Sequence, residues 1–458
     1  MKKFNLSLHI FRRDLRLDDN SALLAALEMS EQVMPVFIFD ERQLENPFHG
    51  SNSFQFMMNS LLELNQRLIE KGSRLYFFKG VAHEVLEQIL EKTKAQAVFV
   101  NRDYTPFSRQ RDEQIASVCQ KHQVEFNTYA DALINEPEQV LKNDGNPYSV
   151  FTPFMRKARF NPVTKPIPNS FSNYFKGHVN NSSEIDDPQK LLKSENPNIL
   201  LNGGREEGLA LHEKLHGLFN YDVDRNLPAV NGISLLSAHH KFGTVSVRES
   251  YWRIVDELGP EHTLINQLYW RDFFSHVVWN FPHVLGKAFK SKYENLAWEN
   301  DQVKFEKWCK GQTGFPIVDA GMRELTTSGF MHNRVRMIVA SFLTKDLHID
   351  WRWGERFFAN HLIDYDPAVN NGNWQWAAST GCDAQPYFRI FNPWSQQQKF
   401  DYQCFYIKKW VPELSELSAS DIHKLQQLPN LLAPNYPRPM VDHSERSQTI
   451  KKIFKDLV

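Results

Sequence analysis

The stretch FNLSLHIF, residues Phe4 to Phe11, places an apolar side chain at every second position, which is typical of a β-strand. Asp19 or Asn20 can cap the helix that the following residues SALLAALEMS predict. A buried-strand pattern, VMPVFIF, comes next, and the strand patterns RLYFF, AQAVFV and VEFNTYA then alternate with helical segments up to about residue 130. Five strands separated by helices predict an α/β fold with a doubly wound parallel sheet.

The predicted sheet carries no familiar phosphate-binding motif. Ligands of doubly wound sheets bind at the carboxyl ends of the strands. The first strand, however, is not followed by GxGxxG, and neither GxxxxGKS nor GxxxxGKT occurs in the chain. An ordinary dinucleotide or P-loop site is therefore not supported.

Three segments of the chain differ in pattern. Residues 1–130 form the predicted α/β domain, residues 131–198 a linker rich in Pro, Asn and Ser, and residues 199–458 a compact all-helical domain whose helical runs are broken by Gly or Pro. Within the linker, residues 146–183 contain no acidic residue, but they include the basic residues Arg156, Lys157, Arg159, Lys165 and Lys176. This stretch fits a phosphate-facing surface, although a solvated connector is the simpler interpretation.

Composition excludes several classes of protein. The net charge of −1 is unlike that of a strongly basic nucleic-acid binder, although a local basic patch remains compatible with it. The four cysteines form no CxxC pair, so neither a disulfide framework nor a zinc ribbon is expected. No signal peptide or membrane-spanning stretch stands out. We therefore expect a soluble, cytoplasmic chain that contacts no membrane.

Two catalytic patterns can be set aside. HEKLH, residues His212 to His216, matches the HExxH pattern of zinc proteases, but no third ligand follows at a known spacing and neighbouring leucines form an ordinary core stripe. No GxSxG marks a nucleophilic serine. We expect no metal site.

The stretch VNNGNWQWAAST, residues 369–380, places Trp374 and Trp376 two residues apart. On a helix these side chains point about 200° apart, so they face different surroundings. Asp364, Asp366 and Asn370 lie close by in the sequence, and this cluster can bind either a metal or a polar heterocycle. The tryptophans and the arginine-rich segment NRVR favour an organic, partly anionic cofactor.

Four long strings closely resemble the DNA photolyase/cryptochrome family and follow its order from about residue 6 to about residue 457. They are FRRDLRLDDNSAL, TGFPIVDAGMREL, GFMHNRVRMIVASFLTKDLHIDWRWGERFF and LIDYDPAVNNGNWQWAASTGCDAQPYFRIFNP. The resemblance implies an α/β antenna domain, a linker, and a helical domain that holds FAD in a U shape.

The same resemblance implies a set of FAD-binding residues. Asp364 is expected to hydrogen-bond the isoalloxazine edge with Arg336 as its charge partner, and Asn370 to lie close to flavin N5, where an amide tunes the cofactor. The segment ISLLS departs from the family's usual Thr-Ser-Arg-Leu-Ser, so phosphate contact should rest on two serines and an arginine. The remaining expected cofactor contacts are Tyr221, Ile233, Ser234, Leu235, Leu236, Ser237, Gln267, Arg271, Tyr365 and Asp366.

The resemblance also assigns the tryptophans and the DNA side. Trp374, Trp351 and Trp298 are expected to relay electrons to the flavin, with Trp374 nearest to it and Trp298 at the surface. Trp376 is expected to line the lesion cavity on the other side of the helix. The expected substrate and DNA contacts are Arg225, Gln267, Trp270, Asn333, Arg334, Met337, Trp376 and Arg389.

The implied function is light-driven repair of cyclobutane pyrimidine dimers in UV-damaged DNA, single- or double-stranded, by a monomer. Met337 favours this lesion because (6-4) photolyases carry a histidine there. Gln267 points the other way, since cyclobutane enzymes usually have glutamate at that position. A (6-4) photolyase and a cryptochrome-type blue-light photoreceptor that signals through a protein partner therefore remain alternatives.

The antenna chromophore stays open. NRDYTPFSRQRD, residues 101–112, resembles the antenna-domain segment of the family. Methenyltetrahydrofolate, 8-hydroxy-5-deazaflavin, a second flavin and no antenna at all are each compatible with it.

Overall fold

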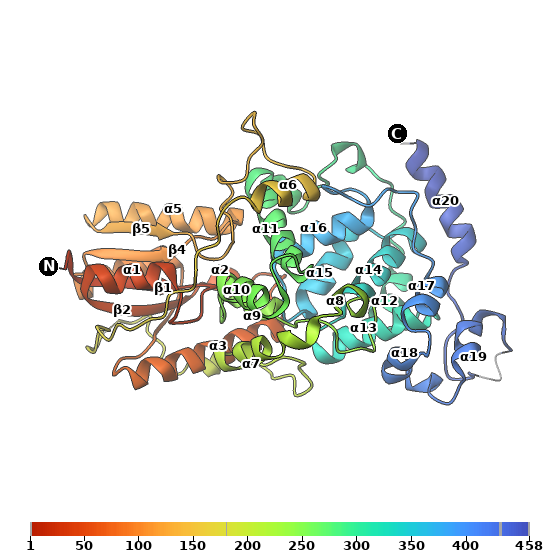
Figure 1. Cartoon of the computed structure of the whole chain (residues 1–458), viewed down its shortest axis with the longest axis horizontal. Helices are drawn as coiled ribbons and strands as arrows, with labels where there is room; N and C mark the ends of the chain where they lie inside the picture. The colour runs from red at the N-terminus through yellow and green to blue at the C-terminus, as the bar shows by residue number, and fades with distance from the viewer. Residues whose placement is uncertain (1, 180, 430–432, 457–458) are drawn as a thin grey trace. The chain divides into compact units, whose positions relative to one another are not determined.

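The computed structural model describes residues 2–179, 181–429 and 433–456, and its chain folds into two compact units. The first unit combines residues up to 195 with residues 201–216 and 234–282. The second combines residues 196–200, 217–233 and the chain from 283 onward. Figure 1 shows the elements of both units along the chain.

The first unit contains a five-stranded parallel sheet in the order β3-β2-β1-β4-β5. Its strands are β1 (Phe4–Phe11), β2 (Ser30–Phe39), β3 (Tyr76–Lys79), β4 (Ala97–Asn101) and β5 (Glu125–Tyr129). Most side chains of β1, β2 and β4 are buried on both faces, as expected for a parallel sheet covered by helices. This arrangement confirms the predicted doubly wound α/β fold.

Helices between the strands cover the sheet. They are α1 (Ser21–Met29), the short α2 (Glu41–Leu44), α3 (Ser51–Glu70), α4 (Ala82–Thr93) and α5 (Pro106–Lys121). Asn20, one of the two predicted caps, begins α1, and its side chain accepts a hydrogen bond from the backbone N–H of Leu23. Apolar residues of α4 and α5 pack against β1, β2 and β4 in one continuous core.

In the predicted linker, the described residues form one α-helix, α6 (Phe151–Ala158), and a short 3-10 helix over Pro188–Leu191. Four further helices belong to the same compact unit as the sheet, although they come from the segment predicted to form the helical domain. They are α7 (Arg205–Glu213), α9 (Ser237–Phe242), α10 (Val247–Leu258) and α11 (Leu264–Asn280).

A buried ion-pair network joins the loop after β1 to α10 within this unit. The Arg16 guanidinium lies 2.7 Å from the Asp131 carboxylate, and Arg248 contacts Asp131 at 2.8 Å and Asp19 at 3.0 Å. Burial alone would raise the pKa of Asp131, but the two guanidinium groups outweigh it and lower that pKa to about 2. Arg16 and Asp19 of the string FRRDLRLDD therefore stabilise the fold.

Asp131→Asn should lower the free energy of unfolding by about 3–5 kcal/mol, because two buried guanidinium groups lose their charged partner. The pKa of Asp131 is lowered in the folded state, so its stabilisation is present above about pH 4, the unfolded pKa, and is lost as the pH falls toward about 2. Urea unfolding at pH 7 and pH 3 measures both effects. Equal stability of variant and wild type at pH 7 would contradict this role.

The second unit is helical. Its main helices are α8 (Tyr221–Asp224), α12 (Gln302–Cys309), α13 (Pro316–Ser328), α14 (Asn333–Ser341), α15 (Trp351–His361), α16 (Pro367–Ala378), α17 (Pro393–Phe400), α18 (Phe405–Trp410), α19 (Ala419–His423) and α20 (His443–Asp456). A large apolar core that includes Trp308, Trp351 and Trp374 joins several of them. This arrangement confirms the predicted all-α part of the fold. Among the described residues, no helix is long and apolar enough to cross a membrane.

Candidate functional site

Helix α16 carries Trp374 and Trp376, and Asp366 caps its N-terminus. The Asp366 carboxylate accepts hydrogen bonds from the backbone N–H groups of Ala368 and Val369, at 3.0 Å and 3.3 Å. Trp374 is buried in the core of the second unit, whereas Trp376 is only partly buried. The helix therefore holds one indole inside the core and leaves part of the other accessible.

Just before α16, Asp364 forms an ion pair with Arg336 of α14. The Arg336 Nη2 atom donates to Asp364 Oδ2 at 3.0 Å, and its Nε atom donates to the backbone oxygen of Met331 at 2.7 Å. The other carboxylate oxygen, Oδ1, is buried and has no hydrogen-bond partner among the described residues. Because leaving a buried acceptor unsatisfied costs about 1–3 kcal/mol, this atom fits a bound group that brings an N–H donor.

Asn370, six residues after Asp364, is held in one orientation. Its Nδ2 atom donates to the backbone oxygen of Glu355 at 3.1 Å, and the neighbouring Asn371 donates to the Glu355 carboxylate at 2.9 Å. Burial raises the pKa of Glu355 to about 7, although the Asn371 hydrogen bond opposes the shift. Because the amide nitrogen of Asn370 already donates to Glu355, its amide oxygen is the atom that can accept a hydrogen bond from a ligand N–H group.

The three tryptophans of the expected relay pack on one apolar core. Trp374 and Trp351 are buried, and Trp298 is partly exposed. The rings that contact Trp374 most closely are Phe358 at 4.9 Å and Trp308 at 6.2 Å between centroids. Trp308 is not among the residues expected in the relay, because a tryptophan on an amphipathic helix resembles any core residue.

The expected DNA contacts of the second unit include side chains accessible to solvent. Asn333 and Arg389 are exposed, and Met337 is partly exposed with its sulfur 4.0 Å from Asn333 Nδ2. The guanidinium of Arg334 lies 4.3 Å above the Phe400 ring and also donates to Asn226. Arg225 lies 5.3 Å above the ring of Tyr221, an expected cofactor contact that is itself buried.

Of the remaining expected site residues, Ile233 and Tyr365 belong to the second unit and the others to the first. Gln267, Trp270 and Arg271 lie on α11, and Ser234 to Ser237 lead into α9. Leu235 has a left-handed backbone with φ of 57°, a conformation that a branched side chain rarely adopts. Arg271 donates to the backbone oxygens of Ala132 and His240, so its expected phosphate contact stays a prediction.

The HEKLH motif does not form a zinc site. Helix α7 ends at Glu213, between the two histidines, so they do not share one helical face. The His212 Nε2 atom instead hydrogen-bonds Ser250 at 2.8 Å, and His216 is exposed.

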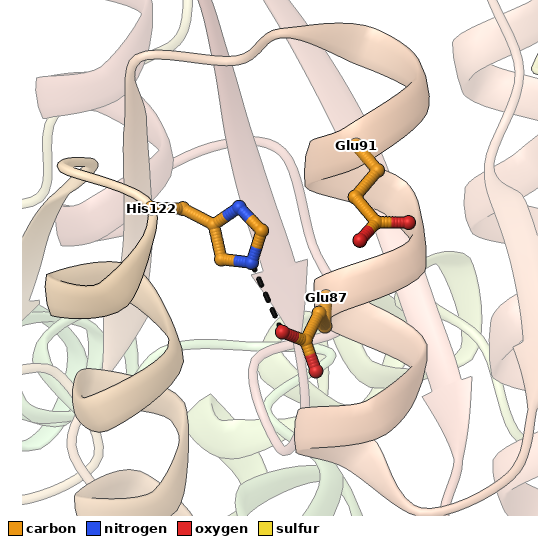
Figure 2. A group of neighbouring side chains, drawn as sticks. All are labelled: Glu87, Glu91 and His122. Atoms are coloured by element: carbon orange, nitrogen blue, oxygen red, sulfur yellow. Dashed lines mark hydrogen bonds and ion pairs between the residues drawn. The ribbon is translucent and has the colours of Figure 1, made fainter.

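One group of metal-ligating side chains occurs among the described residues, and Figure 2 shows it on the first unit. Glu87, Glu91 and His122 bring their ligand atoms within 4.8 Å of one another. The same Glu87 oxygen that lies 3.0 Å from His122 Nε2 also accepts a hydrogen bond from Lys121 at 2.5 Å. We assign no metal to this group, because a lysine ammonium already neutralises its central carboxylate.

Comparison with family models gives two matches. The model described as DNA photolyase matches residues 7–170, and the one described as FAD binding domain of DNA photolyase matches residues 264–456. The curated relatives include deoxyribodipyrimidine photo-lyases from Synechococcus sp. (37% identical over 97% of this chain and 96% of the relative) and Vibrio cholerae (36%, 97% and 98%).

Solved structures agree with this result. A class III photolyase from Agrobacterium tumefaciens has a TM-score of 0.92 at 33% identity, covering 100% of this chain and 98% of its own. An archaeal photolyase from Sulfolobus tokodaii, described with two FAD molecules, has a TM-score of 0.88 at 43% identity, covering 98% and 100%. Identity of this degree over nearly the whole length shows that the chain belongs to the DNA photolyase family.

Proposed function

We propose that this chain uses FAD and light to repair cyclobutane pyrimidine dimers in DNA. The observation that carries the proposal is the buried Oδ1 atom of Asp364, which has no hydrogen-bond partner in the described part of the chain, although Oδ2 of the same carboxylate pairs with Arg336. A flavin ring edge offers the N–H donor that this oxygen lacks. Illumination with a dimer-containing oligonucleotide tests the proposal, and we expect intact pyrimidines in the light and unchanged dimers in the dark.

Three residues of the second unit would hold and tune the flavin. Asp364 would accept from a ring N–H while Arg336 balances its charge, and Asn370 would turn its amide oxygen toward N5. When bound, FAD supplies a group that absorbs near-UV or blue light and donates an electron. Trp374, Trp351 and Trp298 would return electrons to it from an external reductant.

The lesion would bind as a flipped-out pair of bases. Trp376 and Trp270 offer aromatic faces for stacking, and the exposed Arg389 and the partly buried Arg334 offer guanidinium groups to phosphates. Gln267 can both donate to and accept from a pyrimidine, but it lacks the charge of a glutamate. We therefore propose that cyclobutane dimers are repaired with lower affinity or yield than by a glutamate enzyme.

A second chromophore is supported at the sheet of the first unit. The strand order changes direction between β1 and β4, and ligands of open α/β sheets bind at such a point. Two ion pairs, Arg12–Asp112 at 2.8 Å and Arg13–Asp103 at 3.3 Å, lie just beyond these strand ends. The Sulfolobus relative with two FAD molecules makes a second flavin the favoured antenna. Denaturing the holoprotein should then release two flavins per chain.

We also propose that a monomer acts on lesions in single- or double-stranded DNA. The four cysteines are free, which is typical of proteins that function in a reducing cytoplasm.

Lesion binding should weaken as salt rises, because arginines displace counterions from DNA phosphates. Arg334→Ala and Arg389→Ala should each reduce the affinity and lower the slope of log K against log salt by about 1. Fluorescence anisotropy with a dimer-containing oligonucleotide at several salt concentrations measures this slope. Arg323→Ala is a suitable control, since Arg323 is engaged by Glu413 at 2.7 Å and is not an expected DNA contact. An unchanged slope in both test variants would exclude these residues as phosphate contacts.

A further inference from the structure

Helix α6 of the linker segment places an aromatic ring flat against Trp270. The ring centroids of Phe151 and Trp270 are 3.6 Å apart, and the two planes differ by only 8°. Phe151 is itself buried, whereas Trp270 on α11 is only partly buried. One face of the indole is therefore covered by a side chain from a segment that composition marks as a simple connector.

Further contacts hold α6 against α11. One turn along α6, the ring of Phe154 lies 5.3 Å from Phe273 and 4.8 Å from His276. Beyond the end of α6, Arg159 donates to the side chain of Asn266 at 3.1 Å. Along α11, these contacts lie on both sides of Trp270.

Other rings of α11 complete the surroundings of the indole. Phe273 meets Trp270 edge-on at 5.8 Å, and Phe274 lies 5.5 Å away with its plane inclined by 29°. A ring held between neighbours in this way has few alternative rotamers. Since part of Trp270 remains accessible, a base can stack on it without first ordering its side chain, which would otherwise reduce the affinity.

We infer that Phe151 is a positioning residue for lesion recognition and acts through Trp270. It covers one face of the indole and fixes the plane on which the flipped-out pyrimidine stacks. The inference rests on the proposed function, in which Trp270 contacts the lesion. Through Phe151, helix α6 would then contribute to the substrate site.

The test compares dimer binding by the FAD-loaded variants Phe151→Leu, Phe151→Tyr, Phe154→Leu and Trp270→Ala. Phe151→Leu removes the stacked ring and should raise the Kd for a dimer-containing oligonucleotide by roughly three- to tenfold. Phe151→Tyr keeps the ring and should stay within about twofold of the wild type, since the stacking energy is retained. FAD content, read from absorbance, should stay the same in each variant, because none of these side chains is an expected FAD contact.

Phe154→Leu is the matched control, because Phe154 is buried in the same helix pair and has no ring contact with Trp270 among the described residues. It should lower stability about as much as Phe151→Leu but leave the Kd unchanged. Equal weakening by both leucine variants would overturn the inference in favour of general loosening. A normal Kd for Phe151→Leu beside a raised Kd for Trp270→Ala would also overturn it. A normal Kd for Trp270→Ala would instead remove the proposed lesion contact itself.

Discussion

Asp364→Asn should raise the Kd for FAD by about 100-fold or more, because the partly buried Arg336 guanidinium loses its charged partner and the ligand loses a charge-assisted acceptor. The substitution conserves shape, so it tests charge rather than packing. Isothermal titration of the flavin-free protein with FAD gives the Kd directly. The absorbance of the protein as purified gives the FAD content.

Asp401→Asn is a matched control for this experiment. Asp401 is a buried aspartate of the same unit, and it accepts hydrogen bonds from the backbone N–H groups of Tyr406 and Ile407. Its replacement should leave the Kd for FAD unchanged. Normal FAD binding by Asp364→Asn would contradict the assignment of the unpartnered oxygen to the flavin.

Trp374→Phe should slow light-driven reduction of the bound flavin by more than about tenfold, an increase of at least about 1.4 kcal/mol in the barrier. Phenylalanine fills much of the same space but is far harder to oxidise than an indole. The rate of flavin reduction is measured from the flavin absorbance after timed periods of illumination in the presence of a thiol reductant. DNA binding should stay close to that of the wild type.

Trp410→Phe provides the control, because Trp410 packs against the same core and lies outside the expected relay. If Trp374→Phe were reduced as fast as the wild type, the electrons would take another route. Trp308→Phe is then the next variant to examine, since Trp308 is in ring contact with Trp374.

The first unit shows how far local pattern determines a fold. The period-two pattern of FNLSLHIF predicts a strand over residues 4–11, and the structure has β1 over the same residues. Helices between the strands were likewise predictable, because Asn20 and a long apolar stripe in α3 mark them locally. The assignment of α9, α10 and α11 to the unit of the sheet was not predictable, since it depends on long-range contacts such as Arg248–Asp131.

The candidate site was predictable from family strings but not from chemistry alone. The sequence shows that Asp364 and Arg336 carry opposite charges. It does not show that they pair, or that Oδ1 of Asp364 has no hydrogen-bond partner among the described residues. Helix α14 ends at Ser341 and is followed by a π-helical turn, Phe342–Asp346, in which the buried Lys345 donates to the backbone oxygen of Ala378 at 3.0 Å. The stacking of Phe151 on Trp270 could not be predicted either, because the two residues lie far apart in the sequence.

The most direct test of the central claim is repair of defined lesions by the FAD-loaded, reduced protein under blue light. Two short oligonucleotides, one with a cyclobutane thymine dimer and one with a (6-4) product, are illuminated separately and analysed by chromatography. The account predicts that the cyclobutane dimer returns to two thymines only in the light, that Gln267→Glu maintains or raises this yield, and that the (6-4) product is unchanged in both proteins. Repair of the (6-4) product alone, or of neither lesion by a protein that holds reduced FAD, would contradict it.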